Sequence, residues 1–117
     1  MANKLKWHKI KDEIYHNVLW FVYSRKYEEV QKYFKRKGIS LGEVTSNGCW
    51  FHLEKKGKIQ HIIWMDSKDP GLMGHEVFHF VQYALDDVGM NLTKDTAEAY
   101  AYYFQYIFDQ IIKIKVR

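Results

Sequence analysis

The chain has 117 residues, of which 47% are hydrophobic, 17% aromatic and 27% charged, and its formal net charge is +4. This length supports one folded domain with its own core and is too short for two. Cys49 is the single cysteine, which excludes an internal disulfide and a thiolate zinc cluster. The basic excess is only mild, and charged faces that contact solvent alone are far commoner than nucleic-acid-binding faces. Nucleic acid is therefore an unlikely partner.

The sequence shows no targeting or membrane-spanning segment. The first ten residues, MANKLKWHKI, contain no long apolar stretch, and no run approaches the roughly 18 apolar residues of a membrane helix. We therefore expect a cytoplasmic protein that has no signal peptide and no membrane partner.

The N-terminal third predicts a strand followed by a helix. The segment EIYHNVLWFVYS, Glu13 to Ser24, is rich in aromatic and β-branched residues, which favours a strand. The segment from Arg25 to Gly38 has its apolar residues at helical spacing, and Gly38 is a suitable C-terminal stop. Residues 41–48 then predict a short strand or loop that ends in an Asn-Gly turn.

The rest of the chain predicts a β-hairpin and two helices. Two apolar runs, residues 49–54 and 59–66, flank the short loop KKGK. Asp69 is a suitable N-cap for a helix from about Pro70 to Asp87. After a turn in VGMNLT, helical spacing of apolar residues predicts a second helix from about Thr93 to Ile112.

These elements predict the fold class. The sequence contains one proline, no repeat and no low-complexity linker, so residues 1–117 are expected to form a single domain. The order strand, helix, two or three strands, helix, helix predicts an α+β fold in which the helices pack on a small antiparallel sheet.

The first of the two C-terminal helices contains the segment GHEVFHF, with two histidines four residues apart. Residues four apart on a helix lie one above the other, so His75 and His79 can direct two imidazoles at one metal ion. Glu76 lies about 100° around the helix from His75, where it can act as a general base towards water polarised by the ion. This H-E-x-x-H arrangement predicts a zinc site that hydrolyses peptide bonds.

A catalytic zinc site needs a third protein ligand. No histidine follows His79, and Asp86 lies about 10 Å further along the same helix, too far to share one ion. Glu98, near the start of the last helix, fits best, because the alanines beside it allow two helices to approach closely. The segment DTAEAYAYYFQ contains this glutamate.

The segment HEVFH, the 18 residues 80–97 and then EAYAY resemble the HExxH…E arrangement of gluzincin-type zinc metallopeptidases. The short chain resembles the minimal gluzincins, and residues 69–108 are similar to small phage and prophage proteins regarded as metallopeptidases. The resemblance implies Zn²⁺ as cofactor and a peptide or protein as substrate. It also implies that His75, His79 and Glu98 bind the zinc and that Glu76 is the general base.

The sequence departs from other zincin patterns. Gln82 and Leu85 stand where the metzincin form has its glycine and third histidine, and no downstream histidine is present to donate to a transition state. A phenol can stabilise a developing oxyanion instead. Tyr100, Tyr102 and Tyr103 are near in sequence, the spacing does not choose among them, and Tyr102 is the catalytic candidate that we name.

Each site residue also has a purely structural interpretation. His75 and His79 can be a histidine pair without a metal, and Glu76 can be a solvated residue of the first helical turns. Glu98 can close a capping box with Asp95, which would leave a metal with two ligands only.

Two functions therefore stay open. The leading hypothesis is a zinc-dependent peptidase. The second is a zinc-binding but non-catalytic phage-type protein that acts on a host or partner protein, favoured by the lack of a second domain to form a deep cleft. Glu76 opposes the second hypothesis, because a structural site does not need it. Should Glu98 not bind the metal, His61 is the next candidate, because the resemblance puts the strand before the motif helix at the edge of the cleft.

Overall fold

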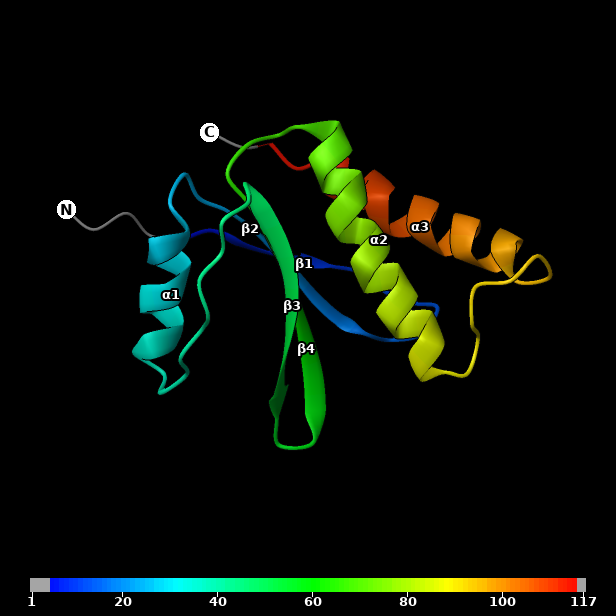
Figure 1. The fold of residues 1–117 in the computed structure, drawn as a ribbon, viewed down its shortest axis with the longest axis horizontal. Helices are drawn as coiled ribbons and strands as arrows, with labels where there is room; N and C mark the ends of the chain where they lie inside the picture. The colour runs from blue at the N-terminus through cyan, green and yellow to red at the C-terminus, as the bar shows by residue number, and fades with distance from the viewer. Residues whose placement is uncertain (1–4, 116–117) are drawn as a thin grey trace.

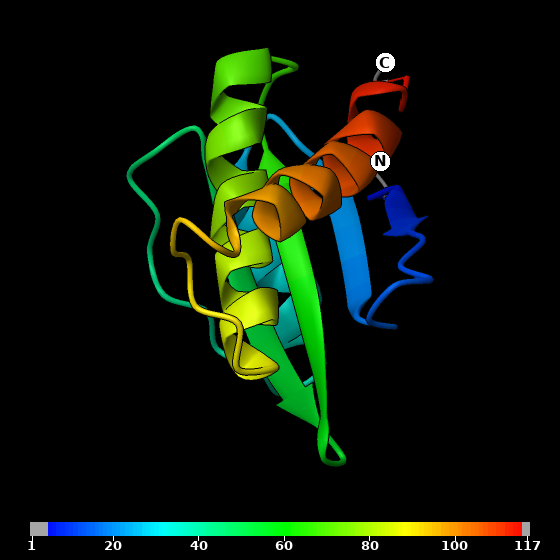
Figure 2. The same ribbon diagram turned by 90° about the vertical axis from the view of Figure 1, so that its right-hand side faces the viewer.

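The computed structural model describes residues 5–115, which form one four-stranded sheet with helices on both faces (Figures 1 and 2). The elements follow in the order β1 (Trp7–Ile10), β2 (Val18–Tyr23), α1 (Tyr27–Lys35), β3 (Gly48–Lys55), β4 (Lys58–Met65), α2 (Pro70–Asp87) and α3 (Ala97–Ile112). The α+β class expected from the sequence is confirmed. Within residues 5–115, no helix is long and apolar enough to cross a membrane.

The sheet is mixed, so the predicted antiparallel sheet is wrong. Its strand order is β1-β2-β4-β3, in which β1 pairs with β2 and β3 with β4 in antiparallel fashion, whereas β2 and β4 are parallel. The parallel pair arises because the chain crosses from β2 through α1 to the far edge before β4 returns beside β2. The strand β3 is thereby left at an edge of the sheet.

The predicted strand at residues 13–24 begins too early. Only Val18–Tyr23 is a strand, and a short strand at Trp7–Ile10 was not predicted. Between them the chain turns around the side chain of Asp12, which accepts hydrogen bonds from the backbone N–H groups of Ile14, Tyr15 and Asn17. A carboxylate that binds its own following backbone favours a turn over an extended strand.

The predicted hairpin is confirmed. The strands β3 and β4 are joined by Lys56 and Gly57, whose φ angles are 52° and 79°. Two consecutive residues of positive φ form the tight turn whose twist suits an antiparallel pair. The turn fixes the register, so that His52 lies opposite His61 and Trp50 opposite Ile63.

Each face of the sheet has its own hydrophobic cluster. Alternate strand residues point to opposite faces. One face packs against α1, through Val22, Ile62 and Trp64 of the sheet and Val30 and Phe34 of the helix. The other face packs against α2 and α3 in the larger cluster, which includes Leu19, Phe21, Ile63, Met65, Val77, Phe80, Val81, Tyr103 and Ile107.

The helices α1 and α2 agree with the expectation, and α3 starts later than predicted. Residues 94–96 form turns, and the N-cap of α3 is Thr96, which makes no side-chain capping hydrogen bond. The hydroxyl of Thr96 instead donates to the backbone carbonyl of Asn91 at 2.5 Å. The capping box proposed for Asp95 and Glu98 is therefore not formed.

Candidate metal centre

The start of α2 determines where the histidines lie. Asp69 is the N-cap, as predicted, and its carboxylate accepts a hydrogen bond from the backbone N–H of Leu72 at 3.4 Å. One side of the helix is anchored in the core by fully buried residues such as Val77 and Phe80. His75 and His79 are therefore exposed on the other side, as helical spacing requires.

The two imidazoles meet through their Nε2 atoms. Nε2 of His75 and Nε2 of His79 lie 3.1 Å apart, and the ring planes are at 80°. Two nitrogens that share one tetrahedral zinc ion at 2.0–2.1 Å are about 3.3 Å apart, so this pair fits zinc. Without an ion, one Nε2–H group donates to the other nitrogen.

Glu76 is buried beside this pair. Its side chain is 7% exposed, and its Oε2 lies 3.9 Å from Nε2 of His75. Within residues 5–115 its carboxylate makes no hydrogen bond, but its oxygens do not count among the fully buried polar atoms without a partner, so they reach the surface at the histidine pair. The side chain of Glu76 is thus largely buried, while its carboxylate end stays accessible. A carboxylate in this state is available to accept a proton or a hydrogen bond from a molecule at the histidine pair.

The structure does not bring Glu98 into a three-ligand group with the histidines. Among the described residues, no set of three or more histidine, cysteine, aspartate or glutamate side chains is arranged to hold a metal. Glu98 lies exposed in the first turn of α3. The pair thus provides two ligands, and the proposed third remains apart.

The three candidate tyrosines differ in their surroundings. The hydroxyl of Tyr100 donates to Asp86 and to the carbonyl of Met90, at 3.1 and 2.7 Å. The hydroxyl of Tyr103 is buried and bonded to Asp12. Tyr102 is 66% exposed, and in the described part of the chain its hydroxyl makes no hydrogen bond. Of the three, only Tyr102 has a phenol open to a ligand.

An aromatic residue of the sheet, Trp50, packs against the ring of His79. Trp50 of β3 lies nearly parallel to the His79 ring, with centroids 6.3 Å apart and planes at 22°. Its indole N–H donates to Nδ1 of His61 at 3.2 Å. Tyr83 of α2 contacts both Trp50 and His52. Sequence reasoning missed Trp50, although the hairpin turn and strand alternation together put it on the same sheet face as His61.

His61 and Cys49 are poor metal ligands here. His61 is 1% exposed, and burial followed by the positive charge of His52 lowers its pKa to about 4. Its ring is neutral near pH 7, but its Nδ1 already accepts from Trp50. For Cys49, burial and then the charge of Glu76 raise the pKa to about 11, so the thiol is not ionised.

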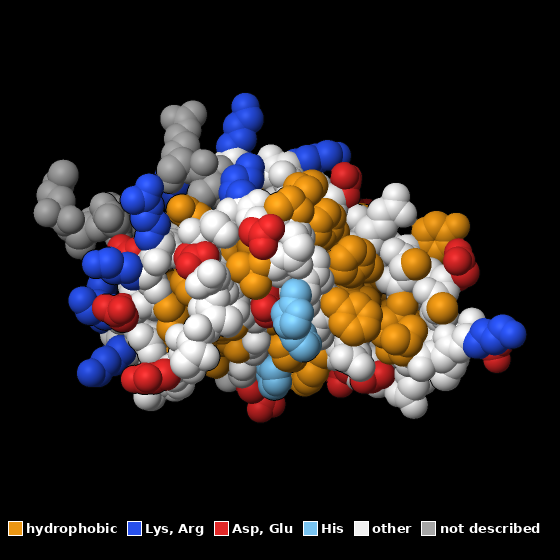
Figure 3. Space-filling model, turned by 45° about the horizontal axis from the view of Figure 1, so that its top comes forward, with side chains coloured by type: hydrophobic (Ala, Val, Ile, Leu, Met, Phe, Trp, Pro, Cys, Tyr) orange, Lys and Arg blue, Asp and Glu red, His pale blue; other side chains and the backbone are white. Residues whose placement is uncertain are grey.

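The surface around the histidines is partly apolar. Figure 3 shows histidine side chains near the centre of one face, beside a broad band of apolar side chains. The large exposed apolar side chains of the described helices α2 and α3 are those of Phe78, Tyr102 and Ile112. A separate pocket of about 520 Å³ lies at the α1 face of the sheet, and its lining includes Trp7, Trp20 and Tyr33 but no histidine.

Comparisons with known proteins find no match to this chain among family models, curated protein sequences or solved structures.

Proposed function

We propose that this protein is a zinc-dependent metallopeptidase. The supporting observation is the convergence of three groups on one side of α2. Two imidazole nitrogens lie 3.1 Å apart, and a buried carboxylate without a hydrogen-bond partner in residues 5–115 lies 3.9 Å from one of them. A chance pair of surface histidines has no need of a largely buried glutamate whose carboxylate opens towards it.

His75 and His79 would hold the zinc, and Glu98 is the proposed third ligand. In the described residues Glu98 makes no hydrogen bond that would have to break, and it lies in the first turn of α3. When bound, zinc lowers the pKa of water and polarises a carbonyl group as a Lewis acid.

Glu76 would act as general base. Its burial keeps the carboxylate in one place, and its lack of a partner leaves both oxygens free to accept a proton from water. It can then deliver that proton to the leaving amine. Tyr102 would donate its phenolic hydrogen to the oxyanion that develops on the substrate carbonyl.

The edge strand β3 is suited to bind the substrate. It pairs only with β4 in the described sheet, and its other edge is unpaired. Trp50 from this strand lies against His79, so β3 runs past the histidine pair. An extended peptide can add to such an edge through backbone hydrogen bonds, with its carbonyl groups near the site.

Two observations favour a second function. The described residues provide two grouped metal ligands and no third, and exposed Phe78 lies between the two histidines in sequence. These features suit a zinc-binding but non-catalytic protein that contacts a host or partner protein through this face.

The deciding experiment measures zinc bound to the purified protein by elemental mass spectrometry. We expect near-stoichiometric zinc in the wild type and a marked loss in His79→Ala and Glu98→Ala. Matched controls are His16→Gln and Asp95→Ala, which remove an exposed histidine away from the site and a nearby exposed carboxylate and should leave zinc unchanged. A wild-type protein that takes up no added zinc would exclude both functions, and full zinc in Glu98→Ala would exclude Glu98 as a ligand.

Peptide cleavage separates the two functions. Glu76→Gln preserves shape but removes the base, so we expect zinc to be retained and cleavage of an unstructured protein substrate to be lost. Cleavage at the wild-type rate by Glu76→Gln would contradict this mechanism. A zinc-loaded wild type without cleavage of any substrate in a peptide library would favour the binding protein.

A further inference from the structure

We propose that Trp50 is a positioning residue for His79. Its indole ring, held in place by a hydrogen bond to His61, restrains the plane of the His79 imidazole so that Nε2 faces His75. The inference rests on the proposed function, because the orientation matters only if the pair binds a metal.

The contact joins the edge strand to the motif helix. The rings of Trp50 and His79 are inclined by 22° with centroids 6.3 Å apart, an offset stack. Tyr83, one helical turn after His79, lies on the same tryptophan at 5.5 Å. Trp50 therefore lies beneath two successive turns of one side of α2.

Trp50 is itself fixed from within the sheet. Its N–H donates to Nδ1 of His61 at 3.2 Å. Trp50 pairs with Ile63, and His61 lies two residues before Ile63 on β4, so the two side chains are diagonal neighbours on one face. His61 is 1% exposed and packs edge-on against the ring of Phe80 at 4.8 Å. An acceptor held this firmly leaves the indole little freedom to rotate.

The restraint replaces one that metal-binding histidines usually have. Such histidines normally donate their second ring nitrogen to a carboxylate or carbonyl, which fixes the ring. Within residues 5–115, neither His75 nor His79 makes a hydrogen bond through Nδ1, and both are exposed. His79 has the indole instead, whereas the ring contact of His75 is with His79 alone among described aromatic residues.

The test compares Trp50→Leu and Trp50→Phe with Trp20→Leu. Trp20 is a matched control, because it lies in the sheet but packs on the α1 side, away from the histidines. The first readout needs no metal: the ring current of Trp50 should shift the His79 imidazole C–H signals in an NMR spectrum, with His79→Gln giving the assignment. The second readout is affinity for Zn²⁺ alone, by competition with a chromogenic chelator, on variants shown to be folded by circular dichroism.

We expect the His79 signals to move in Trp50→Leu and the Zn²⁺ affinity to fall about 10-fold to 100-fold, as for loss of other groups that orient a ligand. Trp50→Phe keeps an aromatic face but loses the hydrogen-bond donor, so its Zn²⁺ affinity should lie between those of the wild type and Trp50→Leu. If Trp50→Leu does not fold, Trp50→Phe provides the test. Trp20→Leu should leave both readouts unchanged.

Two results would overturn the positioning role. One is an unmoved His79 signal in Trp50→Leu, and the other is wild-type Zn²⁺ affinity in both Trp50 variants. If the wild type binds Zn²⁺ and the Trp50 variants bind it equally well, only the positioning role fails. If the wild type binds no Zn²⁺, the proposed function fails and the positioning role fails with it.

Discussion

Asp12 and Glu76 are both buried carboxylates, 8% and 5% exposed, but their surroundings are opposite. The carboxylate of Asp12 accepts four hydrogen bonds, from three backbone N–H groups and from the hydroxyl of Tyr103 at 2.6 Å. In the part of the chain that the structure describes, Glu76 accepts none, and its ion-pair contact is His75. The carboxylate of Asp12 is therefore part of the architecture, whereas that of Glu76 is left open to a ligand.

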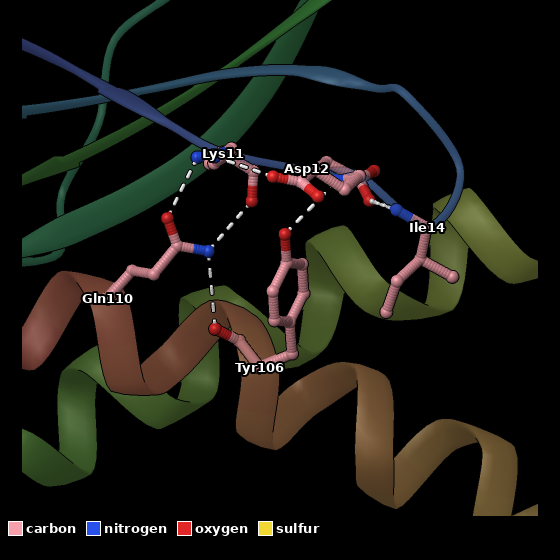
Figure 4. Close-up of polar contacts among 6 residues, drawn as sticks. Lys11, Asp12, Ile14, Tyr106 and Gln110 are labelled. Carbon is pink, nitrogen blue, oxygen red and sulfur yellow. Dashed lines mark hydrogen bonds and ion pairs between the residues drawn. The ribbon is translucent and has the colours of Figure 1, made fainter.

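The surroundings of Asp12 join the β1–β2 loop to α3. Burial alone would raise the pKa of Asp12, but hydrogen bonds from Tyr103 and from the backbone outweigh it and lower the pKa. Close by, both ends of the Gln110 amide bind the backbone of Lys11, at 2.9 and 2.7 Å (Figure 4). The groups named here are hydrogen-bonded, whereas in residues 5–115 the carboxylate of Glu76 and the Nδ1 atoms of His75 and His79 make no hydrogen bond, and the following predictions test that contrast.

The largest effect should come from Asp12→Ala. It removes a charged acceptor and leaves the hydroxyl of Tyr103 without its main partner, so we expect a loss of about 3 kcal/mol in the free energy of unfolding. Urea denaturation measures it. Asp95→Ala, which removes an exposed carboxylate, should change stability by less than about 0.5 kcal/mol. Equal effects of the two variants would mean that Asp12 is not structural.

The second effect is a loss of stability in acid that originates at His61. The pKa of His61 is about 4 in the folded protein, compared with the ordinary value of 6.5 for an exposed histidine. Between these two pH values the unfolded chain binds a proton at His61 and the folded protein does not. The free energy of unfolding should therefore decrease as the pH is lowered through this window, by about 2 kcal/mol from pH 7 to pH 5.

His61→Phe should abolish this pH-dependent difference, while His16→Gln, an exposed control, should retain it. Asp12 affects stability at lower pH than His61. Because its pKa is lowered in the folded protein, its stabilising contribution is lost only as the pH falls below about 4. The contributions of His61 and Asp12 to stability are thus lost in different pH ranges. If His61→Phe has the same pH dependence of stability as the wild type, His61 is solvated in the folded protein.

The third effect distinguishes two neighbouring tyrosines. Tyr103→Phe removes the hydroxyl that donates to Asp12 and leaves the charge short of a donor, so we expect a loss of about 1.5 kcal/mol in thermal denaturation. Tyr102→Phe removes an exposed hydroxyl and should change stability by less than about 0.5 kcal/mol. Only the Tyr102 variant should lower the rate of peptide cleavage.

The smallest effect should come from Glu76→Gln. Replacing a carboxylate that makes no hydrogen bond in residues 5–115 by a neutral amide of the same shape should change stability by less than about 1 kcal/mol. The same chemical change at the other carboxylate, Asp12→Asn, should be destabilising, because its amide group meets N–H donors. A loss above about 2 kcal/mol in Glu76→Gln, measured in urea, would erase the contrast between the two regions.

The motif helix was predictable because its determinants are local. Asp69, Pro70 and the spacing of His75 and His79 all act within a few residues, and the structure reproduces each. The hairpin follows from its short glycine-containing turn for the same reason.

What local patterns in the sequence leave open depends on distant partners. The parallel pairing of β2 with β4 joins residues such as Val18 and Gln60, which no local pattern connects. The role of Asp12 needs Tyr103, and the position of Glu98 depends on how α3 crosses α2 and on where that helix begins. Spacing along the chain determines a helical face, but it does not determine the angle between two helices.

The bond between Asp12 and Tyr103 spans 91 positions of the chain, whereas Trp50 and His61 are 11 apart. During synthesis the ribosome makes β3, β4 and α2 well before it makes Tyr103. Contacts between elements close in sequence, such as those of the hairpin with α2, are expected to form faster than contacts between the two ends of the domain. The bonds that join the two ends of the domain, from Asp12 to Tyr103 and from Lys11 to Gln110, can therefore form only after the hairpin and the motif helix have been made.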